Sequence, residues 1–81
     1  MLYQGEGGAQ DWIQAREYFK LAADQGDAQA QYNYGAMLYK AEGGDKDVVQ
    51  ARHYFKLAVE QAHEYAKATY NAMAAKGEGV Q

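Results

Sequence analysis

Eight residues of this chain recur almost unchanged 36 positions later, and this repeat constrains the fold more than any other feature of the sequence. The stretch Ala-Arg-Glu-Tyr-Phe-Lys-Leu-Ala at 15–22 returns as Ala-Arg-His-Tyr-Phe-Lys-Leu-Ala at 51–58. Periods of about 20 to 50 residues are typical of arrays in which each short unit buries its apolar face against its neighbours. The chain is therefore expected to form an array of small repeated units.

Within each copy, apolar residues follow the spacing of one helical face. Positions 15, 18, 19 and 22 stand at i, i+3, i+4 and i+7, which predicts an amphipathic helix. A second apolar pattern follows after a very short connection, so the two helices are expected to lie antiparallel. The expected elements are a partial helix and turn over 1–10, a helix over 11–26, a helix with its turn over 27–44, a helix over 45–62, a helix over 63–77 and a partial turn over 78–81.

Helix ends are marked by aspartates and glycines. Asp11 and Asp47 each precede an apolar run and are predicted to cap a helix N-terminus. Gly26 is predicted to end one helix in a left-handed conformation, and Asp27 to cap the next helix immediately afterwards. These signals agree with four helices and no strands.

Composition excludes several classes of function. The 81 residues contain no Cys, so disulfides, thiolate metal sites and thiol nucleophiles are ruled out. The net charge is −3 and the eight Lys and Arg are dispersed among acids, so no basic stripe is present for a nucleic acid. No basic start and apolar run marks a signal peptide or a membrane span. The segment is expected to be soluble, and its compartment, cytoplasmic or exported with an upstream leader, stays open.

The stretch Ala-Gln-Tyr-Asn-Tyr-Gly-Ala-Met at 30–37, followed by Glu42-Gly43-Gly44, Asp47 and Ala51 and by the second octapeptide, resembles the Sel1-like repeat. That family is related to the tetratricopeptide repeat and carries a motif close to A-x-A-Q-Y-x-L-G-x-x-Y-x-x-G-x-G-V. The resemblance covers two copies and part of a third. It implies an all-α, right-handed solenoid of antiparallel helix pairs, with about two and a fraction 36-residue repeats.

The same resemblance implies an adaptor that binds a protein or peptide segment on a concave face, with no cofactor and no metal. By position in the motif, the partner-binding residues would be Gln29, Tyr32, Asn33, Ala36, Tyr39, Lys40, Tyr65, Thr69 and Lys76. The residues on the periodic faces are expected to form the core, and these are Ala15, Tyr18, Phe19, Ala22, Ala30, Tyr34, Gly35, Leu38, Ala51, Tyr54, Phe55, Ala58, Ala66, Tyr70 and Met73.

An enzyme is not expected. His53 and His63 have no second metal-ligating residue at helical spacing, and the chain contains no Ser to act as a nucleophile. The glycine-rich turns follow helices rather than strands and lack the Lys-Ser/Thr of a phosphate loop. Hydrolysis of β-lactams, which has been linked to cysteine-rich members of the family, stays as a third and disfavoured alternative.

The register of the repeats leaves a second alternative open. Met1 aligns with Met37 and Met73, so the sequence begins and stops within a repeat. This favours a segment of a longer array, although a complete short protein that pairs through its open ends is the alternative. In either case the chain is expected to self-associate, and a homodimer that acts as a structural module is the competing function.

Overall fold

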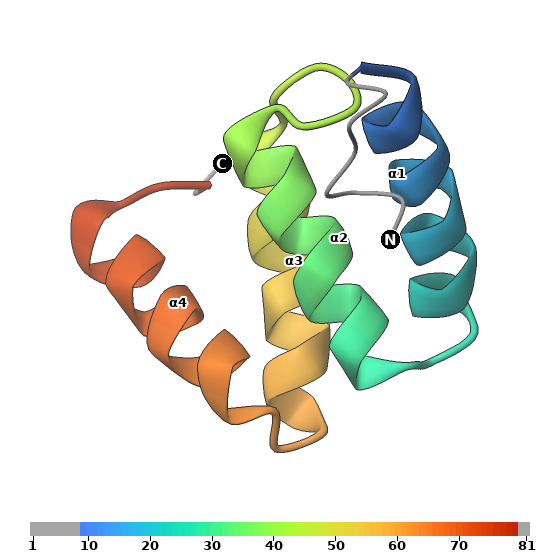
Figure 1. The fold of residues 1–81 in the computed structure, drawn as a ribbon. Coiled ribbons are helices and arrows are strands. Elements are labelled where there is room, and N and C mark those ends of the chain that lie inside the picture. Colours follow the sequence, from blue (N-terminus) through green and yellow to red (C-terminus); the bar gives the residue numbers. More distant parts are fainter. Residues whose placement is uncertain (1–8, 80–81) are drawn as a thin grey trace.

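The computed structural model describes residues 9–79, so residues 1–8 of the partial helix and turn expected over 1–10, and residues 80–81 of the partial turn expected over 78–81, lie outside this range. Four helices follow one another along the chain: α1 (Ala9–Asp24), α2 (Ala28–Lys40), α3 (Val48–Glu60) and α4 (Glu64–Lys76). Each helix packs on the next one in sequence, and α2 and α3 share the most extensive contact. As Figure 1 shows, α1 and α4 flank the central pair α2 and α3 on opposite sides, as in a helical repeat solenoid.

Aspartate side chains that precede α2 and α3 accept hydrogen bonds from backbone N–H groups of the first turn. Asp27 accepts a hydrogen bond from the Ala30 N–H at the start of α2, and Asp47 accepts one from the Gln50 N–H at the start of α3, both at 3.0 Å. Both caps were expected from the sequence. The expected cap at Asp11 is wrong, because α1 begins at Ala9 and places Asp11 inside the first turn. A carboxylate there still interacts favourably with the helix dipole.

The left-handed positions after the helices do not all carry glycine. Gly77 ends α4 with φ of 73°, whereas the equivalent residue after α2 is Ala41 with φ of 60°. Likewise Gly26 is replaced by Ala62 with φ of 66° at the end of the second copy. An L-residue in this conformation costs about 1–2 kcal/mol, which the packing of the adjacent helices must offset.

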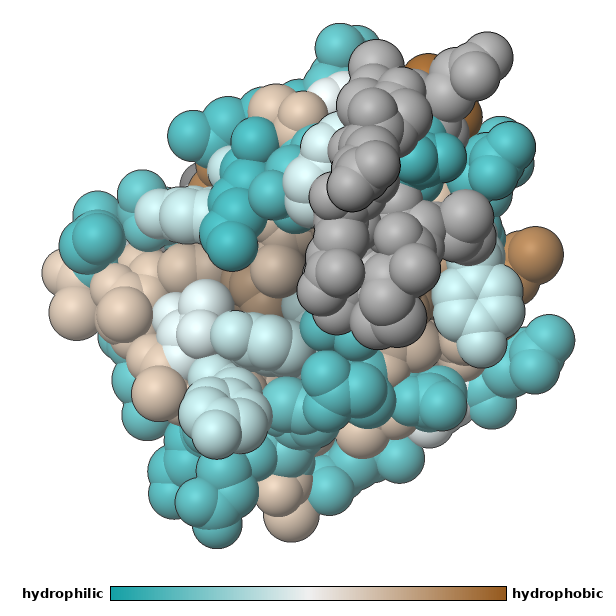
Figure 2. Space-filling model, in the orientation of Figure 1, coloured by the Kyte–Doolittle hydropathy of each residue, from teal (hydrophilic) through white to brown (hydrophobic). Residues whose placement is uncertain are grey.

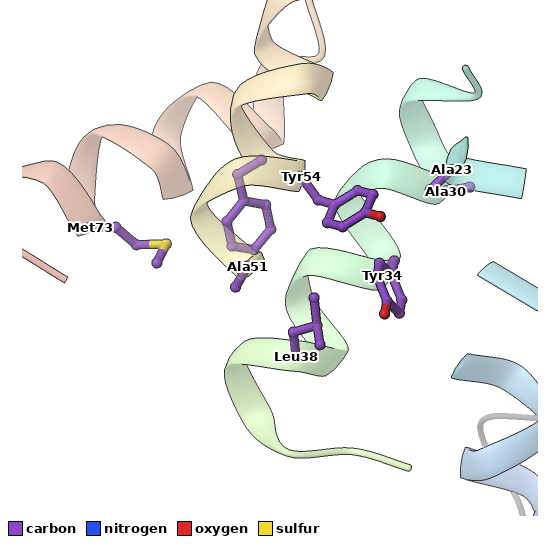
Figure 3. Close-up of a cluster of buried hydrophobic side chains, with 8 residues drawn as sticks. Ala23, Ala30, Tyr34, Leu38, Ala51, Tyr54 and Met73 are labelled. Carbon is purple, nitrogen blue, oxygen red and sulfur yellow. The ribbon is translucent and has the colours of Figure 1, made fainter. Parts of the chain in front are cut away.

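The core lies between α2 and α3 and extends to α1 and α4. Tyr34 of α2 meets Tyr54 of α3 edge to face, with ring centres 4.7 Å apart. Figure 3 shows these rings beside Leu38 and Ala51, with Met73 reaching in from α4. The expected core residues that are buried are Ala15, Ala30, Tyr34, Gly35, Leu38, Ala51, Tyr54, Phe55, Ala58, Ala66 and Met73, while Phe19, Ala22 and Tyr70 are half-buried.

The expectation that Tyr18 belongs to the core is wrong, since 61% of this residue is exposed. Its equivalent one repeat later, Tyr54, is only 8% exposed, because it is covered by Tyr34 and donates a 2.9 Å hydrogen bond to the Asp24 carboxylate. Both covering residues belong to the preceding helices. Within residues 9–79 no helix precedes α1, so Tyr18 has no equivalent cover.

The bond between Tyr54 and Asp24 gives the fold a pH dependence at the alkaline end. Burial and the Asp24 carboxylate raise the pKa of Tyr54 from 10.0 to about 12. The unfolded chain therefore loses this proton at a lower pH than the folded chain does. The contribution of this hydrogen bond to the free energy of unfolding is fully present below pH 10 and falls as the pH rises toward 12. In chemical denaturation, Tyr54→Phe is expected to lose less stability between pH 9 and pH 12 than the parent chain.

The matched control for this experiment is Tyr18→Phe, which changes the equivalent exposed residue of the first copy. It is expected to retain the full pH dependence of the parent chain. Parallel curves for the parent chain and for Tyr54→Phe would show that the hydroxyl of Tyr54 has no such role.

Candidate protein-binding pocket

A pocket of about 270 Å³ opens between α1 and α2. Four residues that were predicted to bind a partner line it from α2, namely Tyr32, Asn33, Ala36 and Lys40. The remaining lining residues are Trp12, Phe19, Met37 and Glu42. The wall is therefore aromatic and apolar, whereas an amide, an ammonium group and a carboxylate provide polar contacts. This combination is typical of sites that bind peptide side chains.

Tyr32 is held in place by α3 and by His63, the residue directly before α4. Its ring packs at 5.6 Å on Phe55 of α3 and stacks at 5.0 Å on His63, with an interplanar angle of 20°. His63 is itself fixed at both ring nitrogens, since Nδ1 accepts from the Ala66 N–H and Nε2 lies 2.8 Å from the Gln29 Oε1 atom. Because Nδ1 accepts, the neutral ring carries its proton on Nε2 and donates it to Gln29.

Gln29 and Tyr65, which were also predicted to bind a partner, lie beside the rings of Tyr32 and His63. Gln29 also donates to the Asn33 Oδ1 atom at 3.3 Å, which positions Asn33 at the pocket. Tyr65 at the start of α4 is 74% exposed, and its ring centre lies 6.4 Å from that of Tyr32. Gln29, Tyr32, Asn33 and Tyr65 thus form one continuous surface from α2 to α4.

Tyr39 is placed elsewhere. Its hydroxyl donates to the Glu78 carboxylate, at 2.9 Å from Oε1, and the Lys46 ammonium lies 5.3 Å from its ring centre. The hydrogen bond with Glu78 raises the pKa of Tyr39 above its usual value. Tyr39 therefore connects α2 to the turn after α4 and does not line the pocket. Thr69 is half-buried and Lys76 is exposed, both on α4 and both outside the pocket lining.

Sequence reasoning missed two arginines that hold the turns after α2 and α4, and the first of these turns provides Glu42 to the pocket. Arg16 of α1 donates to the backbone oxygens of Glu42 and Asp45, at 3.2 and 2.8 Å, and so holds the turn after α2 against α1. Arg52 makes the equivalent bond to the Glu78 oxygen at 3.1 Å. Both arginines belong to the repeated octapeptide, which was the available signal.

A metal site and a membrane-spanning helix were both searched for in the part of the chain that the structure describes. Residues 9–79 contain no group of three or more His, Asp or Glu that could hold a metal ion. None of the four helices is long and apolar enough to cross a bilayer.

Two consecutive segments of the chain, residues 1–27 and 28–63, match the family model of the Sel1 repeat. The chain belongs to the Sel1 repeat family. The second segment begins with the first residue of α2 and ends at His63, directly before α4, so one Sel1 repeat corresponds to the pair α2 and α3.

A solved structure gives the same assignment. The crystal structure of a Sel1 repeat protein from Oxalobacter formigenes is 33% identical and superposes with a TM-score of 0.82 over 85% of this chain. The chain spans about 28% of the length of that protein. The comparison with curated proteins gave no match. Sel1 repeat proteins are in general protein-interaction modules, and the family and fold are typically non-enzymatic scaffolds.

Proposed function

We propose that this Sel1 repeat chain is a non-enzymatic interaction module that binds a protein or peptide segment in the pocket between α1 and α2. The observation that supports the proposal is the convergence of Tyr32, Asn33, Ala36 and Lys40 on one pocket with an aromatic wall. These four residues are among the nine that the repeat motif suggested as partner-binding. The structure adds Trp12 and Phe19 from α1.

The chemistry of the lining favours an extended segment with a bulky apolar side chain. Trp12, Phe19 and Tyr32 offer large rigid surfaces that lose little side-chain entropy on binding. Asn33 accepts from Gln29 through Oδ1, which leaves its Nδ2 group to donate to a peptide carbonyl. Lys40 and Glu42 provide charges of both signs, which orient a segment more than they strengthen its binding.

The decisive variant is Ala36→Arg, because a long side chain at Ala36 fills the pocket while Tyr32, which also contacts Phe55 and His63, is left unchanged. Peptides are first selected against the full chain from a phage library of random dodecamers. The Ala36→Arg chain is expected to bind a selected peptide at least about tenfold more weakly in fluorescence polarisation, because its arginine occupies the site of the anchor side chain.

The control variant is His53→Arg, which introduces the same side chain at an exposed position of α3 outside the pocket lining. Circular dichroism checks that both variants keep the helical content of the parent chain. Equal peptide affinity for the parent, Ala36→Arg and His53→Arg chains would place the binding site elsewhere.

A second candidate function, pairing of two copies as a structural module, is favoured by a different observation. The outward face of α1 exposes three large apolar residues, Ile13 at 46%, Tyr18 at 61% and Leu21 at 66%. The equivalent Tyr54 and Leu57 of α3 are buried and half-buried where the preceding helices cover them. A second copy covering this face of α1 would make a dimer, which the solution mass of the chain detects.

A further inference from the structure

The contact between α2 and α3 shows what the first helix of a repeat needs in order to pack against the second helix. Phe55 lies directly on Gly35, where a Cβ atom would stand 2.9 Å from the ring. Gln61 donates to the Gly26 oxygen at 2.8 Å and to the Gln31 Oε1 atom at 3.0 Å. We call Gly26, Gln31 and Gly35 the repeat seat, since these three positions receive α3.

The same three positions one repeat later are Ala62, Lys67 and Asn71. They line an open groove of about 540 Å³ on α3 and α4. The remaining lining residues are Val59, His63, Glu64 and Ala68. This groove on α4 corresponds in position to the repeat seat and has a different side chain at all three positions, although the backbone oxygen of Ala62 can accept as that of Gly26 does.

Asn71 obstructs the approach that Gly35 permits. At Gly35 even one added carbon would meet Phe55 Cε1 at 2.9 Å and the Ala51 carbonyl oxygen at 3.2 Å. Cβ contacts under 3.0 Å essentially never occur, so a helix with a phenylalanine at the equivalent place cannot approach Asn71 as closely as α3 approaches Gly35. The helix would have to move outward and lose its tight packing.

Lys67 removes the side-chain acceptor that Gln31 provides in the seat. Gln31 is buried, donates to the Ala23 oxygen at 3.2 Å and accepts from Gln61. A lysine ammonium donates but does not accept, so it cannot pair with the amide N–H of a glutamine in the position of Gln61. Covering Lys67 would also bury a charge, which is costly without an ionic partner.

The first helix, in contrast, carries the side chains that a repeat seat receives. Phe19 and Gln25 are the equivalents of Phe55 and Gln61. With a permissive groove on α4, α1 of one copy would pack there on another copy, and such head-to-tail contacts generate open-ended chains. We propose that Asn71 and Lys67 prevent this stacking and limit self-association to the face of α1, so that assembly stops at a dimer. Figure 2 shows strongly hydrophobic residues protruding on the α1 side and mainly polar or weakly hydrophobic ones on the α4 side.

The test compares two double variants of the full chain that differ only at position 71. Lys67→Gln with Asn71→Gly restores the seat, whereas Lys67→Gln with Asn71→Ala keeps a Cβ atom there. Sedimentation velocity over a hundredfold concentration range is expected to show species larger than a dimer for the glycine variant alone. Equal masses for the two variants, or species larger than a dimer in the parent chain, would overturn the proposal.

Glycine weakens a helix by about 1 kcal/mol, so the glycine variant could fail to assemble because α4 loses structure. A second measurement therefore tests the proposal without a glycine in α4. Gln25→Cys and Ala62→Cys are introduced together into the chain with Asn71 and Lys67 intact, which contains no other cysteine. Stacking of α1 on α4 would bring these cysteines of two copies within about the length of a glutamine side chain, as the Gln61 Nε2 atom lies 2.8 Å from the Gly26 oxygen within one copy. A short bismaleimide spans that gap, whereas a direct disulfide does not. Treatment with the bismaleimide is expected to give no ladder of cross-linked multimers, and a ladder would contradict the proposal whatever the glycine variant does.

Discussion

Replacing Phe55 with alanine is expected to cost about 3–5 kcal/mol of the free energy of unfolding, the largest loss for any single truncation in this fold. Only 1% of Phe55 is exposed, and its ring lies on Gly35 and packs against Tyr32. Removing the ring leaves a cavity where α2 and α3 meet. Small domains have only about 5–15 kcal/mol in total, so the variant is expected to be partly unfolded at room temperature. Urea denaturation followed by circular dichroism measures the loss.

Phe19→Ala is the matched control, because Phe19 is the equivalent residue of the first repeat and is only half-buried. The variant is expected to lose less than half as much free energy of unfolding as Phe55→Ala, because folding removes less apolar surface from water at Phe19 than at Phe55. Losses of equal size would show that both repeats bury this phenylalanine to the same degree in solution, contrary to the structure.

Gly35→Ala is expected to destabilise the chain although alanine is the better helix former. A Cβ atom at Gly35 must displace the buried ring of Phe55 or the Ala51 backbone, and such overpacking costs about 1–3 kcal/mol. The gain in helix propensity returns at most about 1 kcal/mol. Thermal and urea unfolding of the variant measure the balance.

Alanine at the equivalent position of the next repeat, Asn71, is expected to change the free energy of unfolding in the opposite direction. Asn71 is exposed on α4, so Asn71→Ala is expected to stabilise the chain by about 0.5 kcal/mol through helix propensity alone. If Gly35→Ala were as stabilising as Asn71→Ala, the close approach of α3 to α2 would not exist in solution.

Local patterns were sufficient to predict the helices. The 3.6-residue spacing and the aspartates at 27 and 47 indicate where α2 and α3 begin, because a cap acts within one turn of its own helix. Tyr18 shows the limit of this reasoning. Its sequence surroundings match those of Tyr54, yet the two differ in burial since the cover of Tyr54 comes from Asp24 and Tyr34. A periodic face shows which side of a helix is apolar and does not show whether a neighbour covers it.

Contacts between distant residues were the part that the sequence did not predict. Arg16 reaches Asp45 and Gln61 reaches Gln31 across 29 and 30 residues. Such bonds depend on how the helices pack, which a repeated motif does not specify atom by atom. For the same reason the motif indicated the α2 side of the pocket, while the contribution of Trp12 and Phe19 from α1 became apparent only in the folded chain.

The fluorescence of Trp12 tests the central proposal most directly. Trp12 is the single tryptophan of the chain and lines the pocket, so it reports on the site without a label. Titration with a peptide selected against the full chain is expected to give a saturable change in emission in the parent and His53→Arg chains. In Ala36→Arg this change is expected to be absent or to need at least about ten times more peptide. Tight binding by calorimetry with unchanged Trp12 emission, or an identical titration of Ala36→Arg, would contradict a binding site between α1 and α2.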